Sequence, residues 1–217
     1  MRTRLACGRR SRLAVLAAAA VTAATLIGAT PANADSAIAV TNPSFIQPYV
    51  NPTAPDAYVR VPLGVDTIPG WRVTNNDVDV FGRAASKTSG SSVVDSGSQA
   101  VDLNGSTTGG IEQTIRTEPG SVVTITFAAK INDHPFCATY ESSNNQSLLV
   151  QFAGNTSRAE SFSLGTVATP GRYARWQLER AVLPATGRHS RLQFLSTNAG
   201  HCGPLITDIR ATDNTTT

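Results

Sequence analysis

The sequence predicts an all-β protein in which two β-sheets pack face to face. Short runs of alternating apolar and polar residues dominate the chain, and Gly, Pro, Asn, Ser and Thr separate them. No segment has the 3.6-residue apolar period of an amphipathic helix. About ten predicted strands in one domain indicate a sandwich of two sheets.

Two segments show the alternation most clearly. In residues 123–127, valine, isoleucine and phenylalanine alternate with threonine. In residues 173–183, the face that carries Trp176 and Leu178 should be buried, and the opposite face, which carries Glu179, should be exposed. Each segment therefore predicts a strand with one face toward the core.

The other strands follow from shorter runs of the same kind. Leu192 and Phe194 should share a buried face, and the Ser- and Gly-rich residues 84–98 predict a long loop between strands. Further strands are predicted over residues 37–41, 58–61, 78–81, 99–103, 111–116, 148–152 and 205–211.

The first 34 residues predict a cleaved signal peptide. A basic region with five arginines precedes the apolar residues 13–29, and Ala32-Asn33-Ala34 matches a small-x-small cleavage site. The apolar run spans about 17 residues and no stop-transfer pattern follows it, so no membrane span is expected. Residues 35–217 are expected to form one secreted domain that ends in a short polar tail.

Removal of this leader changes the net charge of the chain. The whole sequence has 18 basic and 15 acidic residues, and five of the arginines lie in residues 1–34, which contain no acid. Residues 35–217 therefore carry 13 basic and 15 acidic residues, a net charge of −2. This charge offers no electrostatic basis for nucleic-acid binding.

Two cysteines follow the leader, Cys137 and Cys202, and each lies in a polar loop. Exported proteins form disulfides readily, so a bond between them is expected, and the alternative is a pair of free buried thiols. Closing this long loop would stabilise the fold by about 4 kcal/mol. The bond would hold two loops at one end of the sandwich, where we expect the functional site.

Two residues on predicted strands have both a binding and a structural interpretation. Trp71 follows the Pro69-Gly70 turn, where its ring is either a stacking platform for a sugar or part of the core. Gln113 shares an otherwise apolar strand face with Ile111 and Ile115. Its amide either binds a sugar hydroxyl or satisfies nearby backbone groups.

The remaining candidates lie in or beside predicted loops. Asp79, Asn104 and His201 are expected to hydrogen-bond sugar hydroxyls, and Tyr140 is a second candidate for stacking on a sugar face. Asp102 lies opposite Val101 and Leu103 on its strand and is expected to face solvent.

No catalytic arrangement is predicted. The three histidines, His134, His189 and His201, have no metal-binding spacing, and neither a G-x-S-x-G elbow nor a phosphate-binding loop occurs. Acidic residues are so numerous that a pair at glycosidase spacing would mean nothing by itself. A disulfide-bonded Cys202 is no nucleophile, so His201 is not expected to act as its base.

An ordered set of short motifs resembles a family of exported proteins. The motifs are Asn42-x-Ser44-Phe45, Ile68-Pro69-Gly70-Trp71, Val78 to Phe81, Gly97 to Gly105, Gly110-Ile111-Glu112-Gln113, Pro119-Gly120 and Cys202-Gly203-Pro204-Leu205. In this order they resemble the bacterial choice-of-anchor C proteins and the plant cell-wall proteins classed as a domain of unknown function. The resemblance covers residues 41–211, and the placement of the two cysteines is similar to the plant branch.

This resemblance implies a galactose-binding-like, antiparallel jelly-roll sandwich in an extracellular or cell-wall protein. It also implies a structural calcium where the first and last strands meet, with Asn42, Ser44 and Asp208 as ligands. The family has a glutamate after Phe45, and Ile46 stands there in this chain, which removes one acidic ligand.

Together these observations predict a secreted, non-catalytic carbohydrate-binding protein that recognises a cell-wall or environmental polysaccharide or oligosaccharide. A protein–protein interaction module that binds a wall-associated protein is the second interpretation. A glycoside or ester hydrolase is the third.

Overall fold

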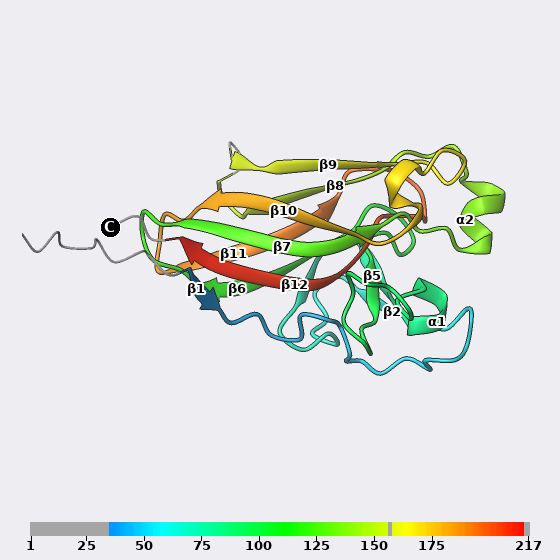
Figure 1. Cartoon of the computed structure of the whole chain (residues 1–217), viewed down its shortest axis with the longest axis horizontal. Helices are drawn as coiled ribbons and strands as arrows, with labels where there is room; N and C mark the ends of the chain where they lie inside the picture. The colour runs from blue at the N-terminus through cyan, green and yellow to red at the C-terminus, as the bar shows by residue number, and fades with distance from the viewer. Residues whose placement is uncertain (1–34, 156–157, 215–217) are drawn as a thin grey trace, which may run out of the picture. The chain divides into compact units, whose positions relative to one another are not determined.

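The predicted strands assemble into two antiparallel sheets in the computed structural model, which describes residues 35–155 and 158–214 (Figure 1). The predicted signal peptide lies outside the described residues. The strands are β1 (Ser36–Ile38), β2 (Tyr58–Pro62), β3 (Arg72–Asn75), β4 (Asp77–Phe81), β5 (Ala100–Asp102), β6 (Gly110–Arg116), β7 (Val122–Lys130), β8 (Gln146–Phe152), β9 (Glu160–Gly165), β10 (Gln177–Pro184), β11 (His189–Ser196) and β12 (Leu205–Asn214). The helical segments are α1 (Arg83–Ser86), α2 (Pro135–Tyr140) and the 3₁₀ turn η2 (Gly171–Ala174).

Sheet A has seven strands among the described residues, in the order β10-β7-β12-β5-β4-β2, with β1 also paired to β12. The first half of β12 pairs with β5 and the second half with β1, and an irregularity that includes Asp208 separates the halves. Sheet B has five strands, in the order β3-β6-β11-β8-β9. All of these pairs are antiparallel, and the predicted all-β jelly-roll sandwich is confirmed.

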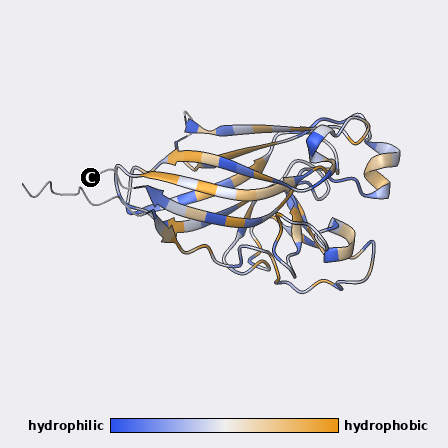
Figure 2. Ribbon diagram, viewed as in Figure 1, coloured by the Kyte–Doolittle hydropathy of each residue, from blue (hydrophilic) through white to orange (hydrophobic). Residues whose placement is uncertain are grey.

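The core lies between the two sheets, because hydrophobic and polar positions alternate along the strands (Figure 2). Phe127 of β7 packs edge to face on Phe194 of β11, with 5.1 Å between the ring centroids, and Trp71 packs on Phe194 at 6.1 Å. All three side chains are at most 1% exposed. Burial of a side chain of this size contributes about 1.5–3 kcal/mol to stability. The alternation predicted for residues 123–127 and for Leu192 and Phe194 is confirmed.

The outer face of sheet A carries a smaller apolar cluster, in which residues 82–98 pack against the strands. Trp176 belongs to this cluster and is buried. Leu178 lies on the same face beyond the cluster and is 58% exposed, whereas Glu179 is buried and forms an ion pair with Arg172. The prediction that Trp176 and Leu178 face the main core was wrong. Alternation defines two faces of a strand but not which of them meets the second sheet.

β3 follows the turn before Trp71, where a strand was predicted to begin. Several short elements were not predicted, namely β9, α1, α2 and η2, and η2 takes up the first part of the strand predicted over residues 173–183. β3 and β9 are the edge strands of sheet B; in β9, Phe162 and Leu164 alternate with serines, a signal that could have predicted this strand. α1 and α2 have four and six residues, too few to show an apolar period. None of the helices in the described part of the chain has the length and apolar character needed to cross a membrane. α1 and α2 lie at the same end of the sandwich (Figure 1, right).

Candidate functional site

A pocket of about 270 Å³ opens on the outer face of sheet A, beside the predicted disulfide. Its floor comes from β2, β4 and β5, and its wall comes from α2 and the loop before β12. We call it the disulfide-side pocket, and its lining residues are Tyr58, Arg60, Asp79, Phe81, Asp102, Gly105, Asn132, His134, Phe136, Cys137, His201 and Cys202. Segments that are far apart in the sequence therefore meet in one cavity.

Strand register aligns the polar floor of this pocket. Arg60 of β2 lies opposite Asp79 of β4, which in turn lies opposite Asp102 of β5. Arg60 donates to both carboxylate oxygens of Asp79, at 2.9 and 3.0 Å, and to the carbonyl of Gly105 at 3.1 Å. The hydrogen bond to Asp79 raises the pKa of Arg60, although burial opposes this. The two-pronged pair fixes a planar charged surface at the floor.

Asp102 lies deeper and is 1% exposed, so the prediction that it faces solvent was wrong. Its Oδ1 accepts hydrogen bonds from the N–H groups of Asn104 and Gly203, at 2.8 and 2.9 Å, and its Oδ2 accepts one from Asn132 at 2.7 Å. Burial and the nearby carboxylate of Asp79 raise the pKa of Asp102 well above its usual value, and these three donors offset only part of that shift. A side chain at Gly203 would collide with Asn104 and Asp102, so glycine lets this loop pass close behind the pocket.

Aromatic rings border the pocket on two sides. Tyr58 packs on Phe81 with 5.5 Å between the centroids. Opposite them, Phe136 packs on Tyr140 at 5.0 Å and on the ring of His201 at 5.8 Å. Tyr58 is 48% exposed and Phe136 is 43% exposed. Each side of the pocket therefore carries a partly exposed aromatic ring, Tyr58 of β2, over which Arg60 lies, and Phe136 of α2.

His134 joins one side of this rim to α2. Its Nδ1 accepts a hydrogen bond from the N–H of Phe136 at 3.3 Å, which caps the helix, so its Nε2 carries the proton and donates to Asp56 at 3.1 Å. The ring of His134 also lies 5.8 Å from that of Phe81. These contacts fix the start of α2 against β4.

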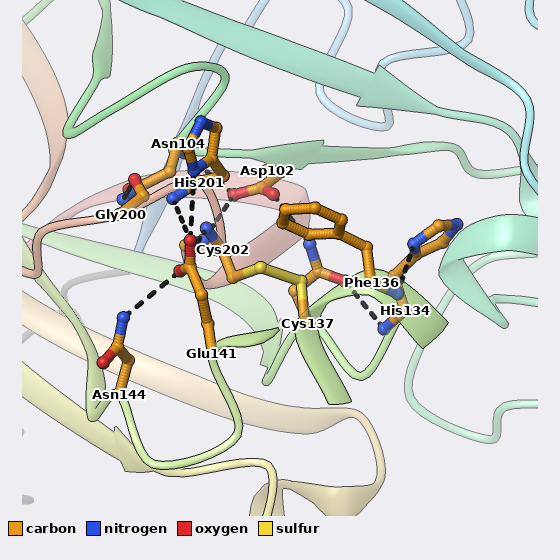
Figure 3. The surroundings of a disulfide bond; sticks show 12 residues. Asp102, Asn104, His134, Phe136, Cys137, Glu141, Asn144, Gly200, His201 and Cys202 are labelled. Carbon is orange, nitrogen blue, oxygen red and sulfur yellow. Dashed lines mark hydrogen bonds and ion pairs between the residues drawn. A yellow bond between two sulfur atoms is a disulfide. The ribbon is translucent and has the colours of Figure 1, made fainter. Parts of the chain in front are cut away.

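The predicted disulfide is confirmed and closes the pocket wall (Figure 3). It links Cys137 of α2 to Cys202, whose Cα atoms are 5.8 Å apart. Glu141, directly after α2, holds the same loop. Its Oε1 accepts from the N–H of His201 at 2.8 Å and from that ring at 3.1 Å, and its Oε2 accepts from Cys202 at 3.1 Å and Asn144 at 3.2 Å. One covalent bond and one carboxylate therefore fix the loop before β12.

Glu141→Gln should lower the free energy of unfolding by about 1 kcal/mol near neutral pH and have little effect in acid. Burial raises the pKa of Glu141, but the N–H donors of His201 and Cys202 outweigh burial and lower this pKa below its usual value of 4.5. A carboxyl group whose pKa falls on folding stabilises the protein above its unfolded pKa. That stabilisation is lost as the pH falls through the folded pKa.

The measurement is denaturant unfolding of the parent and the variant between about pH 7 and about pH 3. The two free energies should converge as the pH falls below 4.5, the ordinary pKa of the group. Glu118→Gln, at an exposed glutamate, is the matched control and should change the free energy of unfolding little at any pH in this range. A difference for Glu141→Gln that stays constant across the range would contradict the prediction.

The family model described as a protein of unknown function, DUF642, matches residues 39–212. The chain belongs to the DUF642 family. The predicted resemblance to a domain of unknown function is thereby confirmed, and the relation to choice-of-anchor C proteins stays a prediction. The comparison with curated proteins finds no match.

The DUF642 chain is also similar to solved carbohydrate-binding modules. A family 35 module from Clostridium thermocellum has a TM-score of 0.41 and 14% identity, over 71% of this chain and 97% of the module. A family 61 module in complex with β-1,4-galactotriose has a TM-score of 0.41 and 19% identity, over 66% of this chain and 88% of the module. A family 4 module has a TM-score of 0.42 and 18% identity, over 81% of this chain and 99% of the module. These similarities concern the fold.

The DUF642 chain brings some of the predicted binding residues to the disulfide-side pocket. Asp79 and His201 line it, and Tyr140, which is 74% exposed, stands at its rim. Asn104 is fully buried behind it and donates to the carbonyl of Gly200 at 2.8 Å. Asn104 therefore supports the loop before β12 and offers a ligand no accessible surface.

Trp71 and Gln113 lie elsewhere. Trp71 is 1% exposed in the main core, and its Nε1 donates to the carbonyl of Asn42 at 3.3 Å. Gln113 is 5% exposed; its amide accepts from the N–H of Thr41 at 2.7 Å and donates to the Thr41 carbonyl at 3.0 Å. Both side chains therefore have the structural contacts that the sequence predicted, but both also line a separate cavity of about 630 Å³, so a role in ligand binding stays a prediction.

Sequence reasoning missed several residues of the pocket. Tyr58 and Arg60 alternate with two valines on a predicted strand, which placed them on its polar face. Their sequence does not show that β2 lies beside β4. Phe136 had a usable signal, because it is an aromatic residue directly before the predicted disulfide at Cys137.

The predicted calcium ligands lie at the irregularity in β12. Oδ1 of Asp208 accepts from the hydroxyls of Ser44 and Ser98, at 2.5 and 2.6 Å, and Oδ2 accepts from the N–H of Asp95 at 2.5 Å. Asn42 bonds within its own turn. No group of three or more His, Cys, Asp or Glu side chains suited to a metal occurs in residues 35–155 and 158–214. Hydrogen-bond donors occupy both oxygens of the Asp208 carboxylate, so these residues as placed do not fit calcium. Calcium binding stays a prediction.

Proposed function

We propose that this protein binds a carbohydrate in the disulfide-side pocket. The observation that carries the proposal is the combination of two partly exposed aromatic rings, Tyr58 and Phe136, with a fixed polar floor. A sugar ring has an apolar C–H face and a belt of hydroxyl groups, and aromatic faces and hydrogen-bonding groups complement them. The volume of about 270 Å³ suits one sugar ring at the end of a chain better than a long segment.

Each polar group of the floor has a defined task in this proposal. Asp79 accepts hydrogen bonds from sugar hydroxyls while Arg60 holds its carboxylate in place. His201, whose side chain is 55% exposed, offers a ring nitrogen at the rim. The disulfide and Glu141 order this wall before the ligand arrives, which lowers the entropic cost of binding.

The two carboxylates of the floor fit recognition better than catalysis. Asp79 accepts two hydrogen bonds from Arg60, and Asp102 accepts three from N–H donors. A glycoside hydrolase needs one carboxyl group that delivers a proton and another that attacks or activates water. We therefore propose a binding protein without a reaction of its own. The predicted signal peptide and the disulfide support a secreted protein whose ligand is a cell-wall or environmental polysaccharide.

The test is retention of the oxidised protein on insoluble cellulose, xylan, pectin, chitin and peptidoglycan, with calcium and with a chelator. We expect retention on at least one polymer and release by its soluble oligosaccharide. Tyr58→Ala and Phe136→Ala should each weaken binding about tenfold, because each removes a ring face from the pocket. Tyr49→Ala removes a tyrosine that is 75% exposed but does not line the pocket, and it should bind as the parent does.

Each other result has a defined meaning. Equal weakening by Tyr49→Ala would contradict the site. No retention on any polymer would contradict carbohydrate binding and favour a wall-associated protein as the partner. Loss of retention only in the chelator would support the predicted calcium.

A further inference from the structure

Both lysines of the chain lie at one place in the fold, although arginine supplies the other 16 basic residues. Lys87 follows α1 and Lys130 ends β7, and the ammonium groups of both bind Asp133, at 2.6 and 2.5 Å. The Lys87 side chain is 58% exposed, and that of Lys130 is 3% exposed. Burial raises the pKa of Asp133, but the two ammonium groups outweigh burial and lower it, so Asp133 is a carboxylate at neutral pH.

These lysines border a second cavity, of about 580 Å³, which we call the lysine groove. One wall is the serine-rich loop of residues 89–93, and the other is the connection from η2 to β10. Trp176 fixes the two walls together, because it is buried and its Nε1 donates to the carbonyl of Lys87 at 3.1 Å. Packing within the protein therefore fixes the shape of this groove on the outer face of sheet A.

The groove carries an excess of positive charge. Lys87, Lys130 and Arg175 line it, and no carboxylate does. Asp133 offsets one of the three cations, which leaves a net charge of about +2 at the groove. The guanidinium group of Arg175 has no hydrogen bond or ion pair within the described residues. An exposed cation pair in a chain whose residues 35–217 have a net charge of −2 indicates an anionic ligand.

The segment between β7 and α2 separates the groove from the disulfide-side pocket. Lys130 lines the groove and binds Asp133, whereas Asn132 and His134 line the pocket. The pocket contains the carboxylates of its floor, so the two cavities differ in electrostatic character. An acidic ligand is therefore expected in the groove and not in the pocket.

We propose that the lysine groove is a second binding site, which takes carboxylate groups of an acidic polysaccharide built from uronic acids. The planar fork of Arg175 matches a carboxylate in two-pronged geometry, and Lys87 adds an exposed ammonium group that also binds Asp133. Ser89 and Ser92, which line the same wall, provide hydroxyl groups for the neutral part of the sugar. This site does not depend on the carbohydrate site proposed for the disulfide-side pocket.

The experiment is calorimetric titration of the full oxidised protein with oligogalacturonate and with its fully methyl-esterified form of the same length. We expect the acid to bind at least about tenfold more tightly than the ester, and binding to weaken as salt is added. The double variant Lys87→Gln/Arg175→Gln should lose at least about tenfold in affinity for the acid. Arg116→Gln/Arg188→Gln removes the same charge from exposed positions outside the groove and should bind as the parent does.

Further variants and ligands distinguish binding in the lysine groove from misfolding, from binding in the disulfide-side pocket and from nonspecific attraction of anions. Arg175→Gln alone leaves the Lys87–Asp133 ion pair in place, so it tests the groove even where the double variant folds poorly. The preference for the acid over the ester should disappear in Arg175→Gln, and this distinguishes the groove from the pocket, whose floor carries acidic groups. Equal binding of acid and ester, or equal weakening by the control pair, would overturn the proposal. Tighter binding of dextran sulfate than of oligogalacturonate would overturn the assignment to carboxylates.

Discussion

The double variant Cys137→Ser/Cys202→Ser should unfold with a free energy about 4 kcal/mol smaller than that of the parent and should bind its sugar ligand much more weakly. The disulfide closes a loop of 65 residues, so its loss enlarges the conformational freedom of the unfolded chain. A loss of this size is a large part of the 5–15 kcal/mol that typically stabilises a domain. Denaturant unfolding and polysaccharide retention measure the two effects.

Binding should suffer beyond the loss of stability, because both cysteines line the disulfide-side pocket. Without the bond, the hydrogen bonds of Glu141 and the packing of Phe136 on the His201 ring are left to hold the loop of His201 against α2. Chemical reduction of the parent should reproduce both losses, and the same reductant should leave the double variant unchanged. Full affinity of the folded fraction after reduction would contradict a role of the disulfide in ordering the pocket.

The fold class could be predicted from sequence because it depends on local alternation. Val123, Ile125 and Phe127 place one face of β7 in the core whatever the neighbouring strands are. The face of β10 could not be assigned in the same way. Trp176 and Leu178 lie on the outer face of sheet A, where residues 82–98 bury the first and leave the second exposed. Such a cover depends on tertiary packing, which alternation does not encode.

The candidate sites depend on register between distant strands, and this explains what the sequence could not show. Arg60, Asp79, Asp102, Leu205 and Lys130 form one continuous row across β2, β4, β5, β12 and β7. The sequence indicates that several of these residues are polar residues on strands, but not that they are neighbours. The buried state of Asp102 likewise follows from three donors that belong to separate loops. The contact between Cys137 and Cys202 could be predicted, because two cysteines in an exported protein are expected to form a disulfide whatever their separation in the sequence.

Trp71→Ala should lower the free energy of unfolding by about 3–5 kcal/mol, the usual cost of removing a large aromatic side chain from a core. Trp71 is 1% exposed, and its ring packs on Phe45 at 5.6 Å and on Phe194 at 6.1 Å. The variant also leaves the carbonyl of Asn42 without its indole donor. Denaturant unfolding measures the loss. Trp71→Phe keeps a ring in the cavity and should cost less.

Binding by these variants separates the two interpretations of Trp71. A core residue affects ligand affinity only through the folded fraction, so Trp71→Phe should bind polysaccharide as the parent does. A sugar-stacking residue would behave in the opposite way, with stability kept and affinity lost. That second pattern is the one expected of Phe136→Ala, because Phe136 is 43% exposed at the rim of the disulfide-side pocket. If folded Trp71→Phe lost affinity, the binding site would lie near the turn at Gly70 and not at the disulfide end. We expect instead that Trp71→Phe keeps its affinity and Phe136→Ala keeps its stability. That result would assign stability to Trp71 and recognition to Phe136.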